Sequence, residues 1–203
     1  MHIRASVLLY DAWLASLVLI AALLVGGCAA KSPGPPPPPS PYHLQVSYAR
    51  SLALSDTHVD KVLADAALIA RTNDGRGDRE CPVPLTRWGT LLPFDGPAII
   101  NTQADLQAVL AQPGQVKVVK EIHWCGGSRA LNLLACTKIG GTSMVVARVS
   151  YFPRQESIVW LHEYAHMRGL DHRNDVGAVM HATVQPSSTM LSKIECDTLT
   201  GKE

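Results

Sequence analysis

Apolar and polar residues alternate in different ways along this 203-residue chain, and each pattern predicts an element of secondary structure. From His43 to Arg50 every second residue is apolar, which is typical of a half-buried strand. Apolar residues then recur every three or four positions from Ser55 or Asp56 to the turn signal Asn73-Asp74-Gly75, which predicts a helix. A second alternating strand is predicted over Gln115–Trp124. Residues 142–150 are apolar on both faces, as in a strand that is covered on both sides.

Two further helices complete the pattern. A short helix is predicted to begin at Asn101 or Thr102 and to end at Pro113. A longer helix is predicted over residues 153–168, since proline is well tolerated in a first turn. The stretch 75–100 is rich in glycine and proline, and we expect loops there with a short strand or two. Strands and helices thus alternate without a repeat, which predicts an α+β (mixed α/β) fold with a loop-rich C-terminal third.

The N-terminus carries the longest uncharged apolar stretch, Ala12–Val25. Its fourteen residues suit a secretory signal peptide and fall short of the roughly 20 that a membrane-spanning helix needs. The stretch ends in Val25-Gly26-Gly27-Cys28, which resembles the bacterial lipobox, where the signal is cut before a cysteine that receives a lipid. We therefore predict a lipoprotein signal peptide over residues 1–27 and a lipid on Cys28. The alternative is an uncleaved anchor from Ala12 to about Ala30, and either one places the domain outside the cytoplasm.

Proline is concentrated directly after this segment. Seven of the fourteen prolines lie between Pro33 and Pro41. A polyproline segment forms an extended helix of about 3.1 Å per residue, so residues 28–42 are predicted to form a stiff spacer. A ligand for a proline-binding module is the competing interpretation. The roughly 160 residues that follow suffice for one domain with a core, which we place at 43–203.

Charge and cysteine content narrow the function classes. The chain has 18 basic and 17 acidic residues, and this balance argues against a nucleic-acid-binding protein. Apart from Cys28 the cysteines are even in number, as expected for disulfides in an exported domain: Cys81, Cys125, Cys136 and Cys196. Three pairings are possible, and we favour Cys125–Cys136, which closes a small loop, together with Cys81–Cys196. The chain has no Cys-x-x-Cys pair among these four, which disfavours a zinc ribbon.

The candidate chemistry lies in His162-Glu163-Tyr-Ala-His166-Met-Arg-Gly169-Leu-Asp-His172. His162 and His166 are four residues apart, so a helix places both on one face, where they can bind one zinc ion. Glu163 can act as general base on a metal-bound water without being a ligand itself. Gly169 suits a sharp helix exit at positive φ, after which His172 can return as the third ligand. Three protein ligands with one open position are typical of a catalytic zinc site.

The competing interpretation is that the two helical histidines face solvent and that His172 is unrelated to them. A constellation of five specified residues at set spacing makes this alternative the weaker one. Four other histidines are interpreted as incidental or core residues: His2, His43, His58 and His123.

With these five residues the sequence resembles the metzincins, zinc endopeptidases with the motif His-Glu-x-x-His-x-x-Gly-x-x-His. The family places a methionine turn beneath the zinc, and the resemblance assigns that role to Met180, eight residues after His172 as in the matrixin-like branch. Ala182 stands where some members have a further tyrosine ligand. The resemblance also implies a twisted sheet, a zinc-binding helix and a loop-rich C-terminal subdomain. It further implies that Thr142–Val149 is the edge strand that binds substrate and that 180–188 forms a wall of the specificity pocket.

We therefore expect a zinc endopeptidase with one catalytic Zn²⁺, in which Glu163 takes a proton from water and passes it to the leaving amine. Its expected partners are a polypeptide substrate and a membrane reached through the lipid on Cys28, with no nucleic acid, and the protein is expected to be a monomer. The expected location is the bacterial cell envelope, at the outer membrane or facing the periplasm. The alternatives are a lipid-anchored zinc-binding protein without hydrolytic activity and an amidase of cell-wall peptides.

Overall fold

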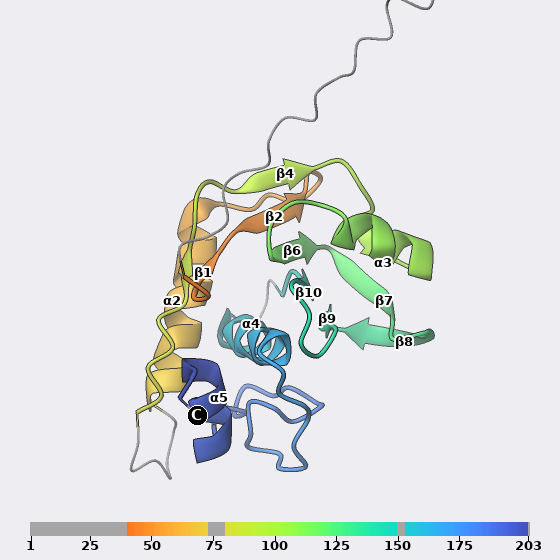
Figure 1. Ribbon diagram of the computed structural model, residues 1–203. Coiled ribbons are helices and arrows are strands. Elements are labelled where there is room, and N and C mark those ends of the chain that lie inside the picture. The colour runs from red at the N-terminus through yellow and green to blue at the C-terminus, as the bar shows by residue number, and fades with distance from the viewer. Residues whose placement is uncertain (1–39, 73–79, 150–152, 203) are drawn as a thin grey trace, which may run out of the picture. The chain divides into compact units, whose positions relative to one another are not determined.

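The computed structural model describes residues 40–72, 80–149 and 153–202, all within the compact unit Pro36–Glu203 (Figure 1). The predicted signal peptide, Cys28 and nearly all of the predicted spacer lie outside the described residues. Within those residues no helix is both long and apolar enough to span a membrane. The described part mixes helices and strands, which confirms the predicted fold class.

A five-stranded sheet forms the centre of the domain, in the order β4-β2-β6-β10-β9. Its strands are β2 (Val46–Ala49), β4 (Leu92–Phe94), β6 (Val116–Val119), β9 (Ala135–Thr137) and β10 (Met144–Ala147). The first four in the sheet order are parallel, whereas β9 pairs with β10 in the antiparallel sense. The prediction that Thr142–Val149 is the edge strand is therefore wrong. That segment forms β10, which is flanked on both sides, and the edge strand next to it is β9, with β4 at the opposite edge.

Burial explains why β6 and β10 are central. All four residues of each strand are buried, as expected for parallel strands with both faces covered. Val116 and Val118 join the larger core, which includes the buried residues of two helices, α2 (Asp56–Thr72) and α4 (Pro153–Met167). Val119 joins a smaller core on the other face, where α3 (Gln103–Leu110) packs. The sheet is thus a layer between two apolar cores.

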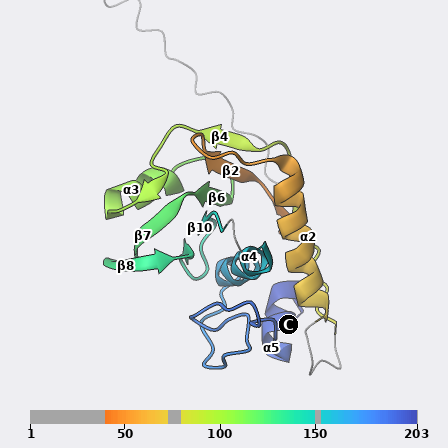
Figure 2. The same cartoon turned by 180° about the vertical axis from the view of Figure 1, so that it is seen from behind.

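The two long helices follow the sequence pattern. The apolar stripe predicted for α2 is buried in full, from Val59 to Ala70. Helix α4 differs, because every residue from Glu156 to His166 is buried, so it runs through the core rather than along the surface. In both views α4 lies between the sheet and the loop-rich C-terminal segment (Figures 1 and 2). A last helix, α5 (Lys193–Thr200), begins with a capping box formed by Ser192 and Glu195.

The smaller strands were partly missed by the sequence patterns. The strand predicted over 43–50 is divided into β1 (His43–Leu44) and β2, and β1 pairs with β3 (Thr86–Arg87). The strand predicted over 115–124 is divided at Lys120, whose N–H donates to Ala98 O, and continues as β7 (Glu121–Cys125) in another sheet. That sheet has the order β5-β7-β8, with β5 (Ile99–Ile100) and β8 (Ser128–Leu133).

The turn between β7 and β8 requires glycine. Gly126 and Gly127 have φ angles of 63° and 88°, and a two-residue hairpin turn with both residues at positive φ suits the twist of the flanking strands. The second strand of this hairpin, β8, ends at Leu133, two residues before the first residue of β9.

Two disulfides tie distant segments together. Cys81 pairs with Cys196 and thereby links the segment before β3 to α5, 115 residues away. Cys125 pairs with Cys136 and links the end of β7 to the middle of the edge strand β9. This is the pairing favoured from the sequence.

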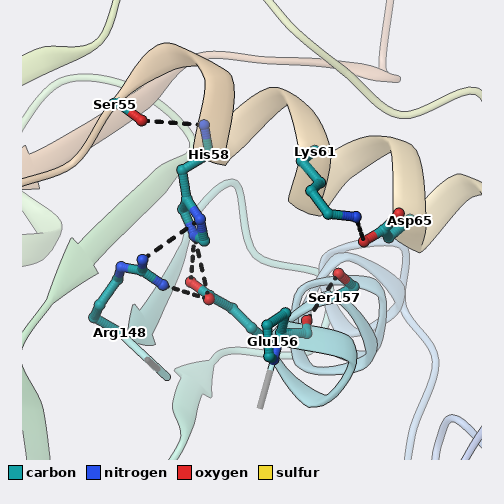
Figure 3. A network of polar contacts seen from close by, with 8 residues as sticks. Ser55, His58, Lys61, Asp65, Arg148, Glu156 and Ser157 are labelled. Atoms are coloured by element: carbon teal, nitrogen blue, oxygen red, sulfur yellow. Dashed lines mark hydrogen bonds and ion pairs between the residues drawn. The ribbon is translucent and has the colours of Figure 1, made fainter. Parts of the chain in front are cut away.

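A buried polar network fastens α4 to α2 and to the end of β10 (Figure 3). The Glu156 side chain on α4 is only 1% exposed, and its Oε2 accepts from an Arg148 guanidinium nitrogen at 2.5 Å. His58 on α2 contacts the same carboxylate at 3.2 Å through Nε2, and Arg148 approaches His58 Nδ1 at 3.4 Å. Burial raises the pKa of Glu156, whereas Arg148 and His58 lower it. The two partners therefore offset part of the cost of burying this carboxylate, because the net shift of its pKa is still upward.

Removing this carboxylate should destabilise the fold. Glu156→Ala leaves Arg148 without its anion, and we expect the free energy of unfolding to fall by about 3 kcal/mol, near the low end for a broken buried pair because Arg148 is 22% exposed. Urea unfolding measures this loss. Lys61→Ala is the matched control: it removes an exposed ion pair with Asp65 one turn along α2 and should cost under about 0.5 kcal/mol. Equal losses in the two variants would contradict the role of burial.

Candidate metal centre

Helix α4 and its exit bring three histidines together. His162 and His166 lie one turn apart on α4, both nearly buried, with ring centroids 4.5 Å apart. The helix ends at Met167, and Gly169 at φ 94° turns the chain back, with the Leu170 N–H donating to Ala165 O. His172, which is exposed, then reaches His166, and their Nε2 atoms are 3.1 Å apart.

The three rings form one ligand set. One nitrogen of each ring lies within 4.8 Å of the others, and among the residues described no other group of histidine, cysteine or acidic side chains has this geometry. The structure therefore brings together the three residues predicted as ligands. Zinc accepts such a set of three imidazole nitrogens and keeps a fourth position open.

Backbone carbonyls orient the two buried rings. His162 Nδ1 donates to Val179 O at 2.6 Å, and His166 Nδ1 donates to Leu170 O at 2.7 Å. Because a carbonyl can only accept, each Nδ1 must carry the hydrogen, which leaves the Nε2 lone pair free. A lone pair of His166 thus faces the His172 ring at 3.1 Å. The residues present therefore fit a cation between the rings.

Burial also favours the neutral form of these ligands. It lowers the pKa of His162 to about 4 and lowers that of His166 below its usual range. Both imidazoles are therefore neutral at pH 7, which is the state that binds a metal ion.

The predicted methionine turn lies in the larger core. Met180 is fully buried, and its O accepts from the Arg173 N–H at 2.7 Å. The preceding residue, Val179, supplies the carbonyl that orients His162. His181 contacts Thr183 and does not belong to the three-histidine group. This turn thus acts on the site through Val179 O, and the role of Met180 as a floor under the metal stays a prediction.

Glu163 lies beside the ligands with an unusual environment. Its side chain is buried, and its Oε1 is 4.0 Å from His162 Nε2. Its other oxygen, Oε2, makes no hydrogen bond within the described part of the chain. Burial raises the pKa of Glu163 to about 7. Such a carboxyl can both take up and release a proton near neutral pH.

A cavity of about 390 Å³ opens in front of these groups. The three histidines and Glu163 line it, together with residues of the edge strand β9, namely Ala135, Cys136 and Thr137. Ala182, Thr183 and Val184 also line it, so part of the predicted wall at 180–188 faces this cavity. Another part of that segment packs inward, since Ser188 is fully buried.

Sequence patterns missed the contribution of β9. The strand has only three residues, and its alternation is too short to be distinguished from a loop. The available signal was Cys136, because a disulfide to Cys125 requires this segment to lie next to the end of β7.

The pKa shifts at the site have opposite consequences for stability in the metal-free protein. Because the pKa of His162 is lowered, its contribution to the free energy of unfolding is complete above about pH 6.5 and is lost as the pH falls to 4. Because the pKa of Glu163 is raised, its contribution to the free energy of unfolding is complete below about pH 4.5 and is lost as the pH rises through 7.

Single substitutions should separate the two contributions. Relative to the unmodified protein, Glu163→Gln should gain about 3 kcal/mol of unfolding free energy as the pH rises from 4.5 to 7. His162→Gln should lose about as much, also close to 3 kcal/mol, as the pH rises from 4 to 6.5. Urea unfolding with a metal chelator measures both. Difference curves that slope in the same direction would contradict the burial argument.

Comparison with known proteins shows what the fold is similar to. No protein-family model matches the chain, and no curated protein matches it. Its structure is similar to the crystal structure of archaemetzincin from Methanopyrus kandleri, with a TM-score of 0.55 and 12% sequence identity. The match covers 79% of this chain and 96% of that one. At 12% identity this similarity shows the fold alone. The similar structure is an archaemetzincin, so the comparison does not support the matrixin-like assignment made from the position of Met180. The chain therefore has an archaemetzincin-like zincin fold, with three histidines gathered beside a buried glutamate.

Proposed function

We propose that this protein is a zinc-dependent endopeptidase that acts on polypeptides outside the cytoplasm. One observation carries the proposal: three imidazoles, two of them oriented by backbone carbonyls, lie next to a buried carboxylate at the wall of a cavity of about 390 Å³. Structural zinc sites are usually closed by four protein ligands, whereas this site offers three and an opening. The archaemetzincin-like fold supports the same conclusion.

The residues of the site have distinct roles in this proposal. His162, His166 and His172 would hold the zinc ion, which when bound supplies Lewis acidity towards a carbonyl and makes water easier to deprotonate. Glu163, whose side chain lines the cavity, accepts the proton of the attacking water and later delivers it to the leaving amine. The backbone carbonyls of Val179 and Leu170 keep the rings of His162 and His166 in place, so these two ligands do not have to reorganise during the reaction.

The edge strand β9 is positioned to bind an extended substrate. It pairs with β10 on one side, and its residues line the cavity beside Glu163. A peptide can therefore add to β9 as a further strand and use main-chain hydrogen bonds for affinity. This assignment replaces the one made from the sequence for Thr142–Val149.

Replacing the proposed base should separate catalysis from metal binding. Glu163→Gln keeps the shape of the side chain but cannot accept a proton, so kcat on a mixed peptide pool should fall at least about 100-fold. Zinc content, measured by atomic absorption, should stay at one ion per chain, because the ligands are untouched. A crystal structure of this variant with a bound peptide should show the peptide paired with β9.

Two variants serve as controls for that experiment. His172→Ala should lose zinc as well as activity, whereas His123→Gln on β7, outside the ligand set, should retain both. Cleavage that persists in Glu163→Gln would contradict the role of Glu163. Zinc binding without cleavage of peptides by the unmodified protein would favour a non-hydrolytic zinc protein, and cleavage confined to purified cell wall would favour an amidase.

We further propose that the domain is exported and anchored to a bacterial membrane by a lipid on Cys28. The two disulfides support export, since disulfides persist in oxidising compartments. Mass spectrometry of the mature protein should find Cys28 as a lipid-modified first residue. An intact N-terminus that begins at Met1 would contradict cleavage and would favour the uncleaved anchor.

A further inference from the structure

The edge strand carries one polar side chain towards the zinc-site helix. Successive residues of a strand point to opposite faces. Ala135 packs against the larger core, to which α4 belongs, whereas Cys136 packs against the smaller core on the other face. Thr137, two residues after Ala135, therefore shares the face of β9 that is directed at α4.

Thr137 and Glu163 each have a buried oxygen without a hydrogen-bond partner. The Thr137 hydroxyl and Glu163 Oε2 are both inaccessible to solvent and unpaired within the described part of the chain. Both side chains line the same cavity. Buried polar atoms in proteins are nearly always hydrogen-bonded, because an unpaired one retains its full cost of desolvation. A hydroxyl can donate and a carboxylate can only accept, so the two groups are complementary.

We propose that Thr137 is a positioning residue, whose hydroxyl, unpaired in this structure, turns to donate a hydrogen bond to the Glu163 carboxylate and so orients the base. This inference rests on the proposed function, because it assumes that Glu163 is the base. The Cys125–Cys136 disulfide holds the residue next to Thr137 and thereby limits movement of the hydroxyl relative to α4. Since β9 is also the strand to which a peptide would add, substrate would bind beside the residue that orients the base.

Three variants test the hydroxyl. Thr137→Val keeps the shape and removes the hydroxyl, Thr137→Ser keeps the hydroxyl, and Thr86→Val makes the same change at an exposed site on β3. On a peptide that the unmodified protein cleaves, kcat should fall roughly 10- to 100-fold in Thr137→Val and less than about threefold in Thr137→Ser, as for the loss or retention of a hydrogen bond to a charged group. KM, zinc content and the urea unfolding midpoint should change little in all three, because neither the ligands nor the strand backbone is altered.

A double-mutant cycle tests whether the hydroxyl acts through Glu163. Glu163→Asp shortens the side chain and moves the carboxylate away from β9, so Thr137→Val should cost a smaller factor in that background than in the unmodified protein. Equal factors in the two backgrounds would overturn the inference.

Other outcomes would also overturn it, and they differ from failure of the proposed function. Unchanged kcat in Thr137→Val, or equal losses in the valine and serine variants, would show that the hydroxyl does not orient the base. If the unmodified protein binds zinc but cleaves no peptide, the proposed function fails, and the positioning role is overturned with it.

Discussion

The burial of α4 from Glu156 to His166 is the constraint on which the rest of the structure depends. A helix that runs through the core cannot leave a polar side chain unsatisfied without a cost in stability. Glu156 meets this requirement through Arg148 and His58. His162 and His166 meet it through the carbonyls of two later turns. Three other polar atoms of α4 have no partner among the described residues, namely Trp160 Nε1, Glu163 Oε2 and Tyr164 Oη. Of these three residues, Glu163 lines the cavity where a reaction can take place.

The site depends on segments that follow the helix as much as on the helix itself. Gly169 turns the chain so that His172 joins the other two rings, and the turn at Val179 fixes the ring of His162. The turn at Gly169 lies three residues before His172, whereas Val179 lies 17 residues after the His162 ring that it orients. Ligands on the helix are therefore held by segments outside it, which suits a site whose rings must stay in place.

The edge strand closes the other side of the cavity. Strand β9 is held by pairing to β10 and by the disulfide from Cys136 to Cys125. Its residues, Thr137 among them, line the cavity that Glu163 also lines. Substrate binding and orientation of the base would thus share one short structural element.

The spacing of nearby residues was enough to predict several features from the sequence alone. These are the buried apolar face of α2, the helix that carries His162 and His166, the end of that helix near Gly169, and the position of His172 beside the other two histidines. These features depend on residues fewer than about 20 positions apart, and helical periodicity reports such relations directly. Only the tertiary structure decided that β9 is an edge strand, that it packs against α4 and that Glu156 pairs with Arg148 and His58. The reason is physical: strands of two to six residues carry little periodic signal, and their order in a sheet is set by long-range packing between two cores.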